Sequence, residues 1–413
     1  MTKKFTYTHL IKKSRALAWL IIDFTAYFFP FRSIKKRKTD ENIILYVGEY
    51  FPVRIQRIVK YLKKRLSYEF VLYVAEWGYE PKLIGEYFDR IEVYRNKYHL
   101  LKKLNTEKLV KLVHSFEPKA YYQYLTYKAL QCPFVYDIQD VLINYFHLNP
   151  PHKWQKKNLV YEKELLRLSD GLISHSLELN EALRNHHVTK RNPSLFFPLY
   201  CDEENFRPIR FESRKTAKIK FVYIGGINAL NDPISSNFLP FIKKLDSTYF
   251  DFTIYPSPIG EYNFYKEYKS LEQQYPTFHM EKSQAFNRLD LSGFDFGVLP
   301  FEHESSETFY SKNLYASTMK FFVYLEMGIP VLVSEYWRFP AWIVKRYNLG
   351  IVTSYAKLDK LKEELDNLDI QSKKKSIALF REKFGLKRNI HRIEEYYRFI
   401  MQSATPQNPK DEV

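Results

Sequence analysis

Cysteine and glycine are both scarce in this sequence. Its 413 residues contain two cysteines, Cys132 and Cys201, in unrelated contexts. Two such cysteines provide neither a disulfide framework nor a cysteine-based metal site, so the chain is typical of a protein from a reducing cytosol. Only 12 glycines occur, and the adjacent pair Gly225-Gly226 therefore indicates a position where the backbone needs particular freedom.

A long hydrophobic run is also lacking. The apolar run at residues 16–31 is shorter than the roughly 20 apolar residues that cross a bilayer, and Asp23 and Pro30 interrupt it. No small-x-small cleavage site follows it and basic residues crowd its far end, which argues against a signal peptide. We expect residues 1–38, a basic and aromatic segment, to be an anchor on an anionic membrane surface. The alternative is a first helix packed on the protein body with a solvated basic flank.

The excess of positive charge is confined to the first half of the chain. The sequence has 64 Lys and Arg against 47 Asp and Glu, a net charge of +17. Residues 1–200 carry 34 basic and 19 acidic residues, whereas residues 201–413 carry 30 and 28. This asymmetry predicts an anionic partner for the first half. Zinc-finger spacing, an aromatic RNA-binding motif and a basic-zipper pattern are absent, so a membrane surface is favoured over nucleic acid.

The first half of the chain alternates between short apolar runs and amphipathic segments. Its composition, 45% hydrophobic and 17% aromatic, predicts folded domains, and 413 residues suffice for two. We expect strands at 43–48, 70–74, 120–124, 134–138 and 171–176, and helices at 54–66, 101–116 and 162–168. This β-α-β order predicts a parallel, doubly wound sheet.

The periodicity is lost between residues 198 and 218, as in a linker, and then resumes. Further strands are expected at 219–226, 252–255, 294–299 and 331–333, and a charged helical stretch at 373–399. The predicted fold is α/β, with two Rossmann-like doubly wound domains, residues 39–205 and 206–375, facing across a cleft. We expect residues 376–413 to form a C-terminal helix and tail that pack back towards the N-terminal domain. A ligand would lie between the domains, outside the carboxyl ends of the strands.

The most informative segment is residues 294–331, which read as strand, polar loop, helix, glycine stop and strand. Ser317 or Thr318 can cap the helix, which leaves first-turn N–H groups to bind an anion. Lys320 in that turn is unfavourable for the helix alone but useful beside a phosphate. Gly328 supplies the left-handed residue that ends the helix.

A family resemblance rests on this segment. Residues 319–331, MKFFVYLEMGIPV, resemble the P-x-K-x-x-E-Y-L-A-x-G-x-P-V signature of GT-B-fold glycosyltransferases, particularly glycosyltransferase family four and related bacterial polysaccharide and lipopolysaccharide glycosyltransferases. Residues 221–226 resemble the opening strand and Gly-rich loop of their donor domain. Residues 135–140 and 169–176 resemble two strand ends of their acceptor domain. The likeness covers most of residues 42–400.

The resemblance implies that residues 39–205 form the acceptor domain and residues 206–375 the nucleotide-sugar donor domain. A nucleoside-diphosphate sugar would be a co-substrate, with no cofactor. No metal would be needed, because Lys320 and the helix start would stabilise the departing diphosphate. The residues that it places at the donor are Gly225, Gly226, Asn228, Glu302, Ser317, Thr318, Lys320 and Glu326.

Three positions depart from the family's pattern. The glutamate usually found five residues before the helix-ending glycine is Val323 here, and its partner glutamate eight residues earlier is Tyr315. The usual carboxylate contacts to donor hydroxyls are therefore missing, and Glu326, one helical turn beyond Val323, is a candidate replacement. Gln139 stands where many relatives have a histidine, which removes an obvious candidate base.

Asp137 and Asp140 are the remaining catalytic candidates besides Lys320. Either carboxylate could orient or deprotonate an acceptor hydroxyl. The alternative is that Asp137 makes a structural ion pair and that Asp140 caps the next helix.

The sequence thus predicts a glycosyltransferase of the hexosyltransferase type, retaining and metal-independent. It would transfer sugar from a nucleotide-sugar donor to a lipid-linked or saccharide acceptor in cell-surface glycan synthesis. Its expected place is cytoplasmic, peripheral on the inner face of the cytoplasmic membrane. Two alternatives stay open: a sugar-nucleotide epimerase or hydrolase, and a non-catalytic GT-B-like subunit that binds a nucleotide or a partner, which Val323 and Tyr315 favour.

Overall fold

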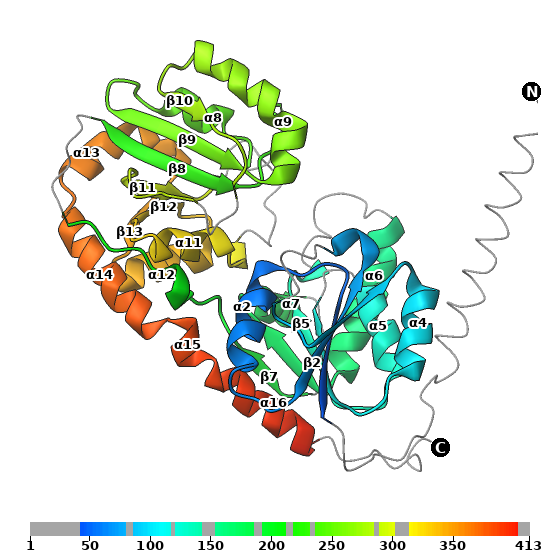
Figure 1. The fold of residues 1–413 in the computed structure, drawn as a ribbon. Helices are drawn as coiled ribbons and strands as arrows, with labels where there is room; N and C mark the ends of the chain where they lie inside the picture. Colours follow the sequence, from blue (N-terminus) through cyan, green and yellow to red (C-terminus); the bar gives the residue numbers. More distant parts are fainter. Residues whose placement is uncertain are drawn as a thin grey trace, which may run out of the picture.

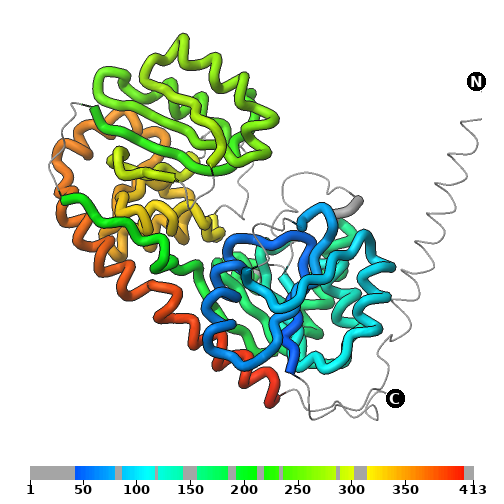
Figure 2. Tube along the Cα trace, viewed as in Figure 1, coloured from blue at the N-terminus to red at the C-terminus, as the bar shows by residue number. Residues whose placement is uncertain are grey.

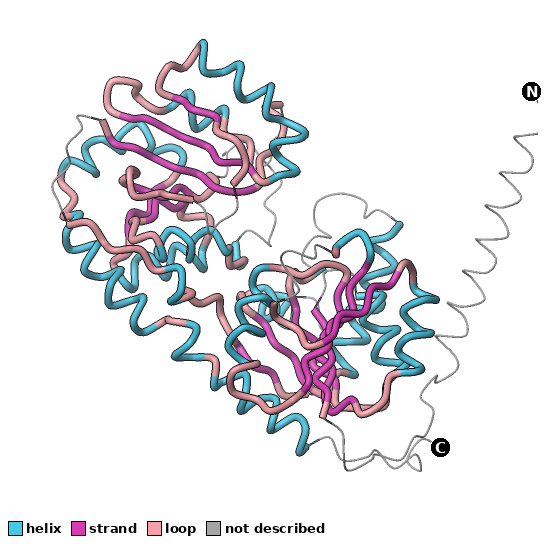
Figure 3. Tube along the Cα trace, in the orientation of Figure 1, coloured by secondary structure: helices cyan, strands magenta, loops and turns pink. Residues whose placement is uncertain are grey.

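The chain forms two α/β lobes, each with strands at its centre and helices around them (Figures 1 and 3). The structure is a computed structural model, and the residues that it describes are 42–79, 86–116, 120–142, 153–185, 192–211, 218–231, 236–284, 289–301 and 314–403. The expected N-terminal anchor, the loop that contains Glu302 and the last residues of the tail lie outside the described residues.

The first domain is built on a seven-stranded parallel sheet with the order β3-β2-β1-β4-β5-β6-β7. Its strands are β1 (Ile43–Gly48), β2 (Glu69–Ala75), β3 (Arg90–Tyr94), β4 (Val110–Phe116), β5 (Phe134–Ile138), β6 (Gly171–Ser174) and β7 (Ser194–Phe196). Helices α2 (Val53–Leu62), α4 (Lys97–Thr106), α5 (Ala120–Ala129), α6 (Lys153–Leu168) and α7 (Glu178–Asn185) connect them. The strand order reverses between β1 and β4, where open α/β sheets bind ligands.

The second domain has a six-stranded parallel sheet with the order β10-β9-β8-β11-β12-β13. Its strands are β8 (Ile219–Gly225), β9 (Phe250–Pro256), β10 (Phe278–Met280), β11 (Phe296–Val298), β12 (Val331–Ser334) and β13 (Gly350–Thr353). Its helices include α8 (Leu239–Lys244), α9 (Pro258–Ser270), α11 (Met319–Glu326), α12 (Arg338–Tyr347) and α13 (Leu361–Asp366). Two doubly wound parallel domains confirm the predicted fold class.

Three consecutive helices run along one side of the molecule, from the second domain back to the first (Figure 2). They are α14 (Ile370–Lys383), α15 (Leu386–Asn389) and α16 (His391–Ser403). The last of them is held on the first domain by Tyr396, whose hydroxyl accepts a hydrogen bond from the Leu172 amide (2.9 Å) and lies 3.1 Å from the Leu172 carbonyl. Helix α16 is therefore part of the first domain's core.

Two predicted elements are wrong. Residues 101–116 were expected to be one helix, but α4 ends at Thr106 and β4 begins at Val110, after Leu109 with a left-handed φ of 66°. Because β4 is buried on both faces, its apolar side chains do not alternate with polar ones and mimic a helical pattern. Residues 120–124 were expected to be a strand because of their aromatic content, but they begin helix α5.

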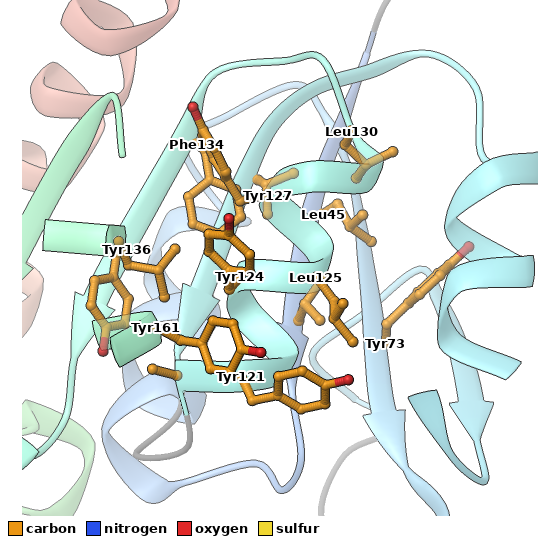
Figure 4. Close-up of a cluster of buried hydrophobic side chains, with 14 of the residues drawn as sticks. Leu45, Tyr73, Tyr121, Tyr124, Leu125, Tyr127, Leu130, Phe134, Tyr136 and Tyr161 are labelled. Atoms are coloured by element: carbon orange, nitrogen blue, oxygen red, sulfur yellow. The ribbon is translucent and has the colours of Figure 1, made fainter. Parts of the chain in front are cut away.

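Helix α5 is stabilised by an aromatic core that lies between it, α6 and the sheet (Figure 4). The rings of Tyr121 and Tyr124 each lie 5.0 Å from the ring of Tyr161 on α6. Tyr127 meets the ring of Phe134 on β5 edge-on at 5.5 Å. This tertiary packing outweighs the strand propensity of the tyrosines.

Among the described helices, none has the length and apolarity needed to span a membrane.

Candidate functional site

The start of α11 meets the end of β8 in the second domain. Gly225 is the last residue of β8 and has a φ of 125°, a backbone conformation that residues with a side chain rarely adopt. A Cβ atom built at Gly225 would lie 2.9 Å from Cε and 3.4 Å from Nζ of Lys320. The side chain of Lys320 therefore lies directly against the backbone of Gly225.

A tyrosine scaffold fixes this arrangement. Lys320 Nζ lies 5.3 Å from the centre of the Tyr223 ring, and the Tyr223 hydroxyl donates to the Gly226 carbonyl (2.5 Å). The buried Tyr324 hydroxyl accepts from the Ile224 amide (3.0 Å) and donates to the Val298 carbonyl (3.1 Å). Helix α11 is thereby bonded to both β8 and β11, so its first turn has a fixed position beside the Gly-rich loop.

The N-terminus of α11 has no side-chain cap. Thr318 is the N-cap residue, and its side chain makes no capping hydrogen bond; Ser317 and Thr318 are both partly exposed. The first N–H groups of a helix lack intrahelical partners, and their dipoles attract an anion. At the other end Gly328 is left-handed, with a φ of 79°, as predicted from the sequence. The helix start can bind a phosphate without displacing a cap.

Asn228 and Glu302 are two further candidates for the donor site. Asn228 follows the Gly-rich loop, and its backbone bonds the Ser236 carbonyl (3.1 Å) and the Tyr268 hydroxyl (3.0 Å). These bonds hold the loop that follows Gly226, and Gly226 is exposed. Glu302 lies outside the described residues.

Glu326 lies at the junction of the two domains. It is 1% exposed, and its carboxylate oxygens accept from Arg57 Nη1 (2.6 Å) and Nη2 (2.9 Å) of α2. The Asp202 amide adds a third bond (2.8 Å). Burial raises the pKa of Glu326, although Arg57 opposes that shift. Its bonds are those of a link between domains, made at the opposite end of α11 from Lys320.

Asp137 is fully buried at the end of β5 and belongs to a polar network. It forms an ion pair with Arg54 of α2 and accepts from His114 Nε2 of β4 at 3.1 Å. His114 Nδ1 contacts the Tyr397 hydroxyl, which lies 3.0 Å from the hydroxyl of Tyr46. Arg54 and His114 hold the pKa of Asp137 below its usual range despite burial. The contacts favour the structural ion pair over a role as a freely accessible base.

Asp140 and His175 stand at the same edge of the first sheet. Asp140 lies just beyond the end of β5 and is partly exposed. His175 follows β6, is buried, and donates from Nδ1 to the Ile138 carbonyl (3.2 Å). Burial, followed by the charge of Arg54, lowers the pKa of His175 to about 4, so the ring is neutral at pH 7. Asp140 therefore remains the accessible carboxylate candidate of this domain.

Two functional candidates, Arg54 and His114, escaped the sequence reasoning. His175 is one of several histidines that the sequence offers, but nothing in its spacing singles it out. For Arg54 and His114 the available signal was position. Arg54 lies in the first turn of the helix after β1, His114 lies in β4, and the strand order reverses between β1 and β4. Within the described part of the chain, no group of three or more His, Cys, Asp and Glu side chains is arranged to hold a metal ion.

Comparisons with known proteins give structural likeness without sequence likeness. No family model matches the chain, and no curated protein matches it. Among solved structures, sucrose-phosphate synthase from Thermosynechococcus elongatus superimposes with a TM-score of 0.62 at 12% identity, over 88% of this chain and 100% of that one. A glycosyltransferase from Rickettsia africae gives 0.61 at 14% identity over 88% and 100%. HepE from Anabaena, in complex with UDP and glucose, gives 0.60 at 12% over 87% and 100%.

This likeness covers both domains and shows the fold. The chain has the GT-B architecture, with two Rossmann-like domains, as the sequence resemblance implied. Sequence identities of this size do not reach a particular glycosyltransferase family, and the resemblance to family four stays a prediction.

Proposed function

We propose that this protein is a glycosyltransferase that takes a sugar from a nucleoside diphosphate. The observation that carries the proposal is the position of Lys320, in the first turn of α11 and in contact with the backbone of Gly225. A lysine, an uncapped helix start and a glycine without a Cβ at one place are what a diphosphate requires. Several proteins of similar fold are glycosyltransferases, and HepE, another similar structure, holds UDP and glucose.

The chemistry follows from charge. When the bond between the sugar and the diphosphate breaks, negative charge grows on the diphosphate oxygens. Lys320 and the first N–H groups of α11 would stabilise that charge in the transition state, in the role that a metal ion has in other enzymes. We propose a metal-independent reaction with no cofactor on this ground. Retention of the anomeric configuration and a hexose as the sugar are further proposals, supported by the resemblance to family four.

The acceptor and the cellular place are proposals as well. A lipid-linked or saccharide acceptor would bind the first domain near Asp140, the partly exposed carboxylate at the end of β5. The basic, aromatic residues 1–38 support attachment to the inner face of the cytoplasmic membrane. Deletion of residues 1–38 should abolish binding to vesicles that contain anionic lipid, and unchanged binding would refute the anchor.

A non-catalytic nucleotide-binding subunit is the second candidate. Val323 stands where the family has a glutamate, and it is 1% exposed within the core of the second domain. The Tyr315 hydroxyl accepts a hydrogen bond from Arg338 (3.2 Å). Neither position offers a carboxylate to donor hydroxyls, which favours this candidate over an epimerase or hydrolase.

Nucleotide binding and sugar release test the proposal together. Titration of UDP, GDP and CMP, followed by thermal shift, should find one nucleotide that stabilises the protein by about 2.7 kcal/mol at 100 times its Kd. Lys320→Ala should abolish that stabilisation. Lys362→Ala is the matched control, because Lys362 also stacks on a tyrosine, Tyr249 (3.8 Å), but at the start of β9 on the opposite sheet edge.

The outcomes separate the candidates. Stabilisation by a nucleotide together with loss of sugar from the matching nucleotide sugar supports transfer. Stabilisation without any turnover supports the non-catalytic subunit. If no nucleotide stabilises the protein, or if Lys320→Ala and Lys362→Ala respond alike, the donor site is refuted.

A further inference from the structure

The side chain of Arg54 has hydrogen-bonding capacity that the protein does not use. Arg54 is 6% exposed, and its Nη1 forms an ion pair with Asp137. Its Nε and Nη2 are buried and have no hydrogen-bond partner among the described residues. Buried guanidinium N–H groups without acceptors are energetically unfavourable, because they have lost their hydrogen bonds to water. Such a group indicates an acceptor that the described residues do not supply, such as a ligand or a buried water.

The surroundings of Arg54 show what kind of acceptor fits. Arg54 lies in the first turn of α2, directly after the switch-point strand β1. It lines a gap between the domains together with Met319, in the first turn of α11 and adjacent to Lys320. The first turns of two helices, one from each domain, thus each contribute a residue to the lining of this gap. Both favour negative charge.

Neither helix start is neutralised by its own residues. Pro52, the N-cap of α2, and Thr318, the N-cap of α11, make no side-chain capping bonds. The first turns of both helices contain no acidic residue. Lys320 adds a cation on the side of the second domain, and Arg54 adds one on the side of the first.

A second arginine on the same helix provides the contrast. Arg57 lies about one turn further along α2, and both of its terminal nitrogens are engaged by Glu326. Arg57 is therefore saturated by the protein. Arg54 shares the helix, the burial and the gap, but only one of its nitrogens is engaged.

We propose that Arg54 is a phosphate ligand contributed by the first domain, which binds an oxyanion through Nε and Nη2 while Asp137 holds Nη1. The inference rests on the proposed function, because it completes from the first domain the diphosphate site that Lys320 forms in the second. His114 and Tyr397 are positioning residues, which act through Asp137 and keep the fork in place.

The binding requires a small movement. The gap lined by Arg54 and Met319 has a volume of about 10 Å³, which is room for one water molecule and not for a phosphate. The two helix starts must therefore move apart when the phosphate enters. The phosphate belongs either to the nucleoside diphosphate or to a phosphorylated acceptor, and both present the same oxygens to the guanidinium.

The experiment compares variants of the full-length protein by calorimetric titration. Arg54→Lys keeps a cation beside Asp137 but loses the planar fork that binds two oxygens. The double variant Arg54→Gln with Asp137→Asn removes the buried pair as a unit and leaves no buried charge, so it remains informative if Arg54→Lys does not fold. The matched control is Arg90→Lys, because Arg90 lies at the opposite, amino end of β3 with its fork on Glu107.

The probes are pyrophosphate, UDP, GDP and the nucleosides uridine and guanosine. We expect the Kd of the preferred nucleoside diphosphate and of pyrophosphate to rise about 10- to 100-fold in both Arg54 variants. Arg90→Lys should leave it within about twofold, and nucleoside binding should not change in any variant. A rise in the KM of a phosphorylated acceptor alone, with an unchanged diphosphate Kd, assigns the phosphate to the acceptor.

Unchanged diphosphate Kd and acceptor KM in folded Arg54 variants overturn the inference, and the free nitrogens then bind only a buried water. This failure is distinct from failure of the proposed function. If the wild-type protein binds no nucleoside diphosphate, the proposed function falls. If it binds one and Lys320→Ala abolishes binding while Arg54→Lys does not, only the role of Arg54 falls.

Discussion

The ion pair between Arg57 and Glu326 should dominate the stability of the domain junction. The side chains of Arg57 and Glu326 are 7% and 1% exposed, so both charges are shielded from solvent. Glu326→Gln keeps the shape and the acceptor for the Asp202 amide but leaves the arginine without its counter-charge. Breaking one partner of a buried pair costs about 3–5 kcal/mol. We expect the lower end, because Asp202 Oδ2 lies 3.9 Å from Arg57 Nε and compensates in part.

The reverse change, Arg57→Met, should make stability depend on pH. Burial already raises the pKa of Glu326, and loss of Arg57 raises it further. A carboxyl whose pKa is higher in the folded than in the unfolded state binds an extra proton when folded. The contribution of this carboxyl to the free energy of unfolding is therefore present below its pKa in the unfolded state. It is lost as the pH rises towards its pKa in the folded state. The slope is up to about 1.4 kcal/mol per pH unit relative to wild type.

Urea unfolding followed by tryptophan fluorescence, at pH 5.5, 6.5 and 7.5, measures both effects. The double variant Arg57→Met with Glu326→Gln should recover at least half of the larger single loss, since it leaves no buried charge. The control is Arg65→Met, which breaks the more exposed pair with Glu394 (2.6 Å; 45% and 14% exposed) and should cost less than about 1 kcal/mol. If Glu326→Gln costs no more than this control, the junction is not the low-dielectric contact described here.

Three shorter predictions concern other residues. Gly225→Ala should weaken nucleoside-diphosphate binding at least about tenfold, because of its φ of 125° and its contact with Lys320, and calorimetric titration measures this. Gly226→Ala should leave the free energy of unfolding unchanged, since its Cβ would meet no protein atom within 4 Å. Tyr397→Phe removes buried hydroxyl contacts and should lower the free energy of unfolding by about 1–2 kcal/mol in urea. The pKa of His175 is about 4 in the folded protein, below its ordinary value of 6.5. The neutral ring therefore contributes fully to the free energy of unfolding above pH 6.5, and roughly 3 kcal/mol of that free energy is lost by pH 4. His175→Gln should reduce this loss of stability between pH 6.5 and pH 4.

The features that the sequence predicted best are those with local causes. The helix of residues 319–326 ends at Gly328 because a glycine there can take the left-handed conformation, and that information lies within one turn of chain. The pair Gly225-Gly226 indicated a position that needs backbone freedom, and Gly225, the last residue of β8, has a φ of 125°. Strand β4 was missed because a strand buried on both faces has no alternating pattern, so only its neighbours β1 and β5 identify it.

The polar partners could not be predicted, because they come from distant parts of the chain. Asp137 was a candidate base by motif alone, yet its environment is set by Arg54 from the first helix and by a tyrosine of the last helix acting through His114. Glu326 was a candidate donor ligand by its place on the helix, yet Arg57 of the other domain occupies it. Motif spacing specifies which residues share an edge and leaves open which partner each one bonds.

Helix α2 shows why this distinction matters for function. A GT-B protein must hold two domains together and still admit a ligand between them, so interdomain contacts and ligand contacts compete for the same surface. Arg57 is matched by a carboxylate of the other domain, which makes it a fixed contact. Arg54 lines the same gap as Arg57 and keeps two nitrogens unmatched among the described residues. A fixed contact between the domains and a candidate phosphate ligand thus lie about one turn apart on α2. A phosphate that binds Arg54 must therefore enter beside the Arg57–Glu326 pair that links the two domains.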